Sequence, residues 1–167
     1  MNVELNHTII PARDKWASAK FLVDILDLEA GPEWGHFVPV RTGNGVTLDF
    51  SDSADFRPQH YAFLVSEAVF DAALSRIRAG GVAHYANFRR ERPGEINHLY
   101  GGRGVCFDDP NGHLLELITR PYGPIPQGDE AEAKKQDRGG DFLGPARALQ
   151  HGAGPPIRLR PPPYARH

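Results

Sequence analysis

Two histidines and two carboxylates occupy matching places in two stretches of this 167-residue chain. In each stretch a histidine comes first, an Asn-Gly pair follows at 44–45 or 111–112, and a carboxylate stands four residues beyond that glycine. Asn-Gly favours a tight hairpin turn, so each carboxylate is predicted in the middle of the strand that leaves the turn. If the stretches face each other, two imidazoles and one or two carboxylates converge, the ligand set of an open divalent-metal site. The four residues are His7, Asp49, His60 and Glu116.

Glu116 is the acid expected to bind the metal. By strand alternation it shares a face with Leu114 and Ile118, so its carboxylate lies on an otherwise apolar line. Such a carboxylate is costly to bury without a cation, although a solvent-facing strand edge would also accommodate it. Together with His7 and His60, it would leave positions on the ion open for substrate.

Asp49 occupies the equivalent place in the first stretch, but it is one methylene shorter and shares its face with Thr47 and Ser51. Three interpretations are open: a fourth metal ligand, an acceptor that orients a ligand or a bound water, or a surface residue. The difference decides the chemistry. Three protein ligands leave room for a chelating substrate and dioxygen, whereas four favour Lewis-acid isomerisation or substitution.

The hydrophobic pattern predicts two modules, residues 1–56 and 57–123, each with its histidine on the first strand and its carboxylate on the last. In the first strand Leu5, His7 and Ile9 share one face. Module one is predicted as strand 5–10, helix 14–28 ending near Gly31-Pro32, and strands 36–41 and 46–51. Module two is predicted as strand 60–65, helix 67–78 ending at Gly80-Gly81, and strands 82–88, 104–108 and 113–119.

Two segments fall outside the repeat. Between histidine and carboxylate, module two (positions 60 to 116) is fourteen residues longer than module one (positions 7 to 49), and residues 89–102 are the natural place for the extra length. An insertion beside a site is usually a substrate loop or lid. Residues 124–167 are rich in proline, glycine and charge and are predicted as a mostly irregular tail, either solvated or docked on a partner subunit.

Composition excludes several classes of protein. A net charge of −2 and a pI near 6.4 give no basic field for nucleic acid. No segment has the length and apolarity of a membrane span or the pattern of a secretory signal, so a cytoplasmic protein is expected. The single cysteine, Cys106, excludes an internal disulfide and is expected to be a small buried strand residue rather than a reactive thiol.

The chain resembles the vicinal oxygen chelate superfamily, which holds glyoxalase I, extradiol dioxygenases, and fosfomycin and bleomycin resistance proteins. The resemblance spans about residues 4–122 and is carried by His7, His60 and the segment 104–117, with its run Asp-Asp-Pro-Asn-Gly-His-Leu-Leu-Glu. It implies an α+β fold in which two βαβββ modules form a curled mixed sheet around a metal. It also implies a homodimer whose modules associate within or across chains.

A finer resemblance is to the ChaP-like branch of that superfamily. The segments that carry it are 9–16, 31–35, 57–63 and 90–98. This resemblance implies non-haem Fe(II), O2 and oxidative cleavage of a small aromatic substrate, a polycyclic polyketide-type diol or quinol, as in antibiotic biosynthesis. Reduced flavin is a candidate co-substrate.

On that hypothesis Fe(II) held by His7, His60 and Glu116 brings a vicinal oxygen pair and O2 together on one ion. His98 and Tyr100, in the inserted segment, are the candidates for proton transfer, against the alternative of a loop histidine without a role. Substrate contacts are expected from Arg92, which could offset an anionic substrate or belong to a solvated basic stretch. Aromatic candidates for the pocket wall, or for core packing, are Trp34, Phe37 and Tyr61.

Two other functions compete with the dioxygenase. A glyoxalase-like isomerase or thiol transferase would need four metal ligands or a cationic anion-binding pocket, and Asp49 within bonding distance of the metal would favour it. A metal-free antibiotic-binding resistance protein would hold a planar drug between the modules. That protein has no reason to keep His7, His60 and Glu116, so these residues argue against it.

Overall fold

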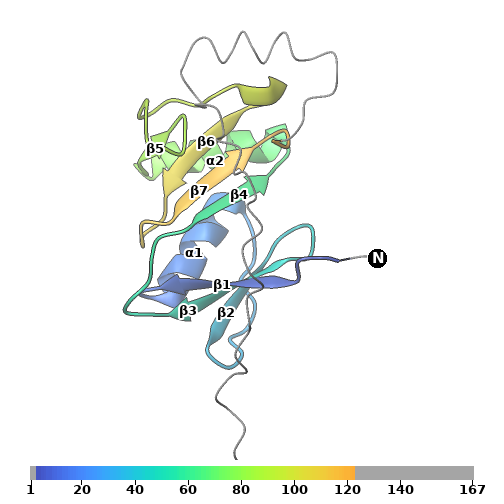
Figure 1. Cartoon of the computed structure of the whole chain (residues 1–167), viewed down its shortest axis with the longest axis vertical. Coiled ribbons are helices and arrows are strands. Elements are labelled where there is room, and N and C mark those ends of the chain that lie inside the picture. Colours follow the sequence, from blue (N-terminus) through green and yellow to red (C-terminus); the bar gives the residue numbers. More distant parts are fainter. Residues whose placement is uncertain (1–2, 123–167) are drawn as a thin grey trace, which may run out of the picture.

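The computed structural model describes residues 3–122, and its elements follow the two predicted modules (Figure 1). Module one consists of β1 (His7–Ala12), α1 (Lys15–Leu26), β2 (Phe37–Arg41) and β3 (Thr47–Asp52). Module two consists of β4 (His60–Leu64), α2 (Glu67–Ala79), β5 (His84–Tyr85), a 3₁₀ turn η1 (Leu99–Gly101), β6 (Gly104–Asp108) and β7 (Leu114–Ile118). The predicted tail lies outside the described residues.

The strands form two mixed sheets with the same internal order. In the first the order is β1-β3-β2, and in the second it is β4-β7-β6-β5. The first strand of each module runs parallel to the last, and the remaining pairs are antiparallel. The register repeats as well, because Ile9 lies opposite Asp49 as Ala62 lies opposite Glu116. The predicted α+β fold of two related modules is confirmed. Each module forms its own hydrogen-bonded sheet, and the predicted curling of the sheets stays a prediction.

Module one lacks a full fourth strand. Where β5 pairs with β6 in module two, module one has a single antiparallel bridge between Ala30 and Val40. The next residue, Gly31, donates its N–H to the carbonyl of Pro39 at 2.8 Å, and then Pro32 follows, which has no N–H to continue the ladder. The βαβββ pattern is therefore complete only in module two.

The helices begin within one residue of the predicted starts, but the first ends early. Asp14 caps α1 by accepting a hydrogen bond from the N–H of Ala17 at 2.9 Å, and Ser66 caps α2 in the same way. Helix α1 stops at Leu26 because Asp27 adopts a left-handed conformation (φ 58°). The predicted end near Gly31-Pro32 was therefore wrong. A short polar residue can take the left-handed position that glycine usually fills at a helix end.

The two Asn-Gly turns have a different geometry from the one expected. Only the glycines have positive φ, 85° at Gly45 and 87° at Gly112, whereas a two-residue hairpin turn would also need positive φ at the asparagines. Each glycine N–H returns to a carbonyl three residues earlier, that of Thr42 or Asp109. Both turns thus end in a left-handed glycine, and both carboxylates still lie in mid-strand as predicted.

One apolar core joins the modules, and it lies on the helix side of both sheets. Residues of α1 and α2 belong to the same buried cluster as alternate strand residues such as Ile10 and Leu117. The opposite sheet faces carry His7 and His60 and are open. Within residues 3–122 no helix is long and apolar enough to cross a bilayer.

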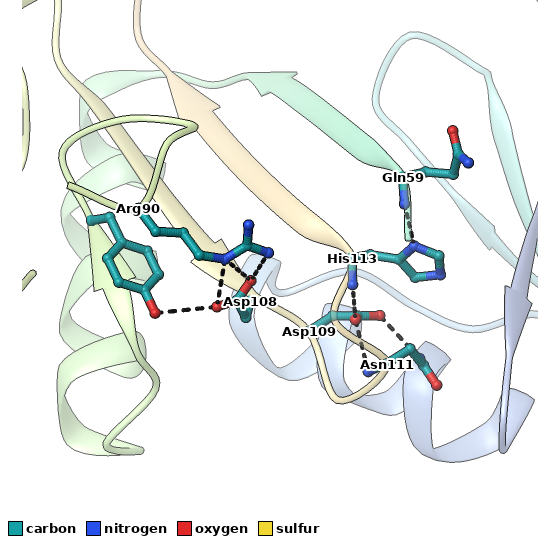
Figure 2. A network of polar contacts seen from close by, with 7 residues as sticks. Gln59, Arg90, Asp108, Asp109, Asn111 and His113 are labelled. Atoms are coloured by element: carbon teal, nitrogen blue, oxygen red, sulfur yellow. Dashed lines mark hydrogen bonds and ion pairs between the residues drawn. The ribbon is translucent and has the colours of Figure 1, made fainter. Parts of the chain in front are cut away.

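The turn before β7 fastens module two to module one. The Nδ2 of Asn111 donates to the hydroxyl of Ser18 on α1 at 2.7 Å and to Oδ2 of Asp109 at 3.1 Å. Oδ1 of Asp109 accepts from the backbone N–H groups of Asn111 and His113, both at 2.8 Å (Figure 2). These side chains are buried and out of reach of water, so their polar atoms depend on these hydrogen bonds within the protein.

His113 completes the junction. Its Nδ1 accepts from the backbone N–H of Gln59 at 2.9 Å, as Figure 2 shows, so the proton must be on Nε2. That Nε2 lies 2.8 Å from the carbonyl oxygen of Pro11 at the end of β1 and donates to it. The Asp-Pro-Asn-Gly-His run of the sequence is thus a structural junction between the modules, while the following Glu116 faces the open side.

Candidate metal and substrate site

His60 and Glu116 meet on the open face of the second sheet. His60 opens β4, Glu116 is central in the neighbouring β7, and the register places both side chains on the face away from α2. The Nε2 of His60 lies 3.0 Å from Oε2 of Glu116. The Glu116 side chain is 9% exposed, whereas that of His60 is 42% exposed. The predicted imidazole and carboxylate are therefore adjacent and reachable from solvent.

Tyr122 fixes the other oxygen of Glu116. Its hydroxyl donates to Oε1 at 2.8 Å, and its ring centroid lies 4.9 Å from that of Tyr100. Burial, and next the charge of Glu116, raise the pKa of the Tyr122 phenol far above its usual value, so the phenol keeps its proton. Tyr122 was not among the site residues predicted from the sequence, because it lies beyond the last strand, where the only signal is an aromatic residue at the edge of the repeat.

A hollow of about 620 Å³ opens above this pair. Its floor holds His60, Glu116 and Leu114, and its walls come from residues just before β4, from Phe88 and the inserted segment, and from Tyr122 after β7. The wall residues are mainly apolar or aromatic: Pro58, Phe88, Leu99, Tyr100 and Tyr122. A mostly apolar cavity with a few converging polar groups is the usual form of a small-molecule site.

Arg90 is the cation on this wall. Its Nη2 lies 2.6 Å from Oδ1 of Asp108, and its Nε lies 3.1 Å from the same oxygen (Figure 2). The Tyr85 hydroxyl donates to Oδ2 of Asp108 at 3.3 Å. The hydrogen bond to Asp108 raises the pKa of Arg90, and burial raises that of Tyr85, so neither group titrates near neutral pH. Arg90 was not among the substrate contacts predicted from the sequence, which named Arg92 in this stretch.

His7 does not join this pair within one chain. It lies on the open face of the other sheet, is exposed, and has Nδ1 only 2.8 Å from the side-chain oxygen of its neighbour Asn6. Among residues 3–122, no three histidine, cysteine, aspartate or glutamate side chains gather closely enough to hold a metal ion. A single chain therefore brings together two donors of the right chemistry, His60 and Glu116, and a metal here needs a donor from elsewhere.

Asp49 is buried in the middle of β3, opposite Ile9 and Pro39, and is only 3% exposed. Its Oδ1 has no hydrogen-bond partner. A buried carboxylate oxygen without a donor is costly, so this position does not suit a simple surface aspartate. Unlike Glu116, it makes no hydrogen bond to the histidine of its own module.

The remaining predicted site residues are distributed over both modules. Tyr100 lines the hollow, but His98 is exposed and does not. Arg92 is exposed and pairs with Glu95 at 3.7 Å. Trp34 and Phe37 contact each other on module one, with ring centroids 5.4 Å apart, and Trp34 is exposed.

Neither Tyr61 nor Cys106 lines the hollow. Tyr61 lies on the helix side of β4 with its ring against His113, 5.7 Å between centroids, so it does not line the hollow. Cys106 is buried opposite Glu116, and burial raises the pKa of its thiol to about 12. The expected buried, unreactive cysteine agrees with this placement.

Comparison with known proteins identifies the family. The model of the glyoxalase/bleomycin resistance protein/dioxygenase superfamily matches residues 4–117. The chain belongs to this superfamily. No curated protein matches the chain.

Among solved structures, two proteins of the superfamily are similar over nearly their whole length. "Oxidase ChaP-H2" is 59% identical with a TM-score of 0.72, and 74% of this chain and 98% of that one are covered. "Oxidase ChaP-H1" is 53% identical with a TM-score of 0.71, and 74% of this chain and 100% of that one are covered. The fosfomycin resistance protein FosX of Listeria monocytogenes, 22% identical with a TM-score of 0.58 over 73% and 97% of the chains, shares the fold.

Proposed function

We propose that the protein is a non-haem Fe(II) dioxygenase that uses O2 to cleave a polycyclic aromatic diol or quinol. The observation that carries the proposal is the contact of His60 with Glu116 at the floor of an apolar hollow, in a chain 59% identical to a protein named an oxidase. An imidazole and a carboxylate suit Fe(II), and the aromatic walls suit a flat ligand.

The third donor in this proposal is His7 of a second copy of the chain. His7 is exposed on an open sheet face, and its imidazole ring makes no hydrogen bond to any described residue other than its neighbour Asn6. Large apolar residues flank both histidines, with Leu5 68% and Ile9 52% exposed beside His7, and Leu64 60% exposed near His60. Within one chain His7 is separated from His60 and Glu116, and apolar surface surrounds both places. This favours a homodimer that buries the apolar surface and brings His7 of one copy to the His60–Glu116 pair of the other.

When bound, Fe(II) would supply the chelation of substrate oxygens and the activation of O2. The residues of the chain provide the surroundings. Tyr122 holds the Glu116 carboxylate in one orientation, and the walls of the hollow exclude water from a bound aromatic face. Tyr100, on the wall, is better placed than the exposed His98 to move a proton at the substrate, and Asp49 is the candidate acceptor for a bound water.

The test is metal analysis and oxygen uptake on protein purified without oxygen. Catechols and anthraquinols are supplied with and without reduced flavin. The proposal predicts bound iron and oxygen consumption with the polycyclic compounds, and the flavin arm decides whether flavin is a co-substrate. Tight zinc or nickel with no oxygen consumption would instead support the isomerase alternative.

A further inference from the structure

Arg90 is held in place by its own loop. Its backbone has φ 59°, which is unfavourable for a residue with a side chain. Asn87, 2% exposed, fixes this conformation because its Oδ1 accepts from the N–H groups of Arg89 at 2.9 Å and Glu91 at 3.2 Å. The N–H of Arg90 itself donates to the carbonyl of Asn87 at 3.1 Å. The loop therefore presents Arg90 in one defined position.

The side chain of Arg90 is oriented but only partly used. Asp108 accepts from Nε and Nη2, and it is itself held by the hydroxyl of Tyr85. No described residue accepts a hydrogen bond from Nη1. A guanidinium has five N–H donors, so Arg90 keeps donors for a ligand in the hollow that it lines. A pre-organised donor loses little conformational freedom when the ligand binds.

Arg90 and the pair His60–Glu116 line the same hollow but are anchored at different places on the sheet. Cys106 is opposite Glu116 in the β6–β7 pair, and Asp108, which anchors Arg90, is two residues further along β6 on the same face. Diagonal neighbours of this kind are separated by roughly 7–8 Å. Phe88 and Leu99 line the same hollow. A flat molecule with oxygens at both ends, longer than one ring, fits this arrangement.

We propose that Arg90 selects the substrate by binding an anionic oxygen at the end of a polycyclic aromatic molecule remote from His60 and Glu116. The inference rests on the proposed function and narrows its substrate class to polycyclic compounds that carry an acidic group, a carboxylate or an ionised phenol. Arg90 is a specificity-determining residue in this account, and the chemistry at the metal does not involve it.

The neighbouring arginines do not fit this role. Arg92 pairs with Glu95 outside the hollow. Arg89 lies over the ring of Phe88, 5.6 Å from its centroid, and does not line the hollow either. We therefore assign to Arg90 the anion-binding role that the sequence suggested for Arg92. Arg92 is the matched control, because it has the same charge and belongs to the same loop.

The test compares two probes with the same ring system and a substituent of similar size, the anionic anthraquinone-2-carboxylate and the neutral 2-(hydroxymethyl)anthraquinone. Their Kd values are measured with the full chain, without added metal, for the wild type and for the variants Arg90→Gln and Arg92→Gln. We expect the wild type to bind the carboxylate about tenfold tighter, a modest factor because Asp108 offsets part of the charge. The ratio of the Kd of the neutral probe to the Kd of the carboxylate should fall to about one in Arg90→Gln and stay at about ten in Arg92→Gln.

The neutral probe reports whether the hollow remains intact. Equal affinity of the wild type for both probes would overturn the inference, as would a ratio that Arg90→Gln retains. Equal loss of both probes in Arg90→Gln would also overturn it, because Arg90 would then be only structural. Iron binding is measured separately on the same wild-type protein. If the protein binds no iron but shows the expected probe affinities, the proposed function is refuted and the role of Arg90 is not.

Discussion

At the scale of single residues, Glu116 differs from Asp49 in what its oxygens contact. Glu116 has Tyr122 on one oxygen and His60 near the other, whereas Asp49 keeps Oδ1 without a partner. The hydrogen bond from Tyr122 fixes the rotamer of Glu116 and leaves Oε2 beside the imidazole. A partner that orients a ligand in this way commonly changes metal affinity by about 10- to 100-fold.

Replacement of Tyr122 by phenylalanine should therefore weaken metal binding. Tyr122→Phe removes the donor to Glu116 and keeps the ring, so we expect the Kd for Co(II), a spectroscopic substitute for Fe(II), to rise about tenfold. Titration of the Co(II) absorption measures it. Tyr100→Phe is the control, because Tyr100 contacts the ring of Tyr122 and not the carboxylate. Equal affinities of Tyr122→Phe and wild type would show that the hydrogen bond does not position Glu116.

At the residue scale the sequence was informative where a pattern was duplicated. The repeated Asn-Gly turn correctly placed Asp49 and Glu116 in mid-strand, and His7 and His60 lie on the first strand of their modules as predicted. Tyr122 follows the repeat and has no counterpart in module one, so no pattern pointed to it. Its role depends on how the chain turns after β7, which periodicity does not encode.

At the scale of elements, the turn between β6 and β7 does more than reverse the chain. Through Asn111 and His113 it bonds to α1 and to the end of β1 in the other module. The equivalent turn of module one has no such task, since Asn44 is exposed and accepts only from the hydroxyl of Thr42 at 2.6 Å. The Asn-Gly pairs at 44–45 and 111–112 therefore contribute differently to the stability of the fold.

This difference predicts unequal losses of stability. Asn111→Ala removes the donor to the buried Ser18 hydroxyl and to Oδ2 of Asp109, so we expect the free energy of unfolding to fall by about 2–3 kcal/mol. Asn44→Ala, at the matching place of an exposed turn, should cost about 0.5 kcal/mol or less. Urea unfolding monitored by fluorescence measures both. Equal losses would contradict the assignment of the second turn as the junction between modules.

The order of helices and strands was predictable because apolar residues recur with a clear helical or strand spacing in this sequence. The residues at which the elements end were not predictable. Helix α1 stops at Asp27, where a left-handed residue other than glycine gave no signal in the sequence. Strand β5 covers only His84–Tyr85 of the predicted 82–88, because Asn87 turns the chain into the loop that carries Arg90. Side chains that bond the nearby backbone compete with strand ladders in this way.

At the scale of the whole molecule, the two modules of one chain share a core but not a metal site. Their helices pack together on the inside, so the faces with His7 and His60 point away from that core. Sequence similarity between the modules could predict that each contributes ligands. It could not predict whether modules of one chain or of two chains face each other, because both arrangements use the same residues.

The most direct test mixes two ligand variants in one dimer. His7→Ala and His60→Ala chains carry different affinity tags, and the heterodimer is isolated and its bound iron measured. If His7 acts across the interface, each homodimer loses its metal sites, whereas the heterodimer regains one complete site out of about two per dimer. A heterodimer of His60→Ala with Glu116→Ala is the control and should regain none, since both losses fall on the same side of each site. No recovery of iron in the first heterodimer, or iron retained by the His60→Ala homodimer, would contradict the shared site.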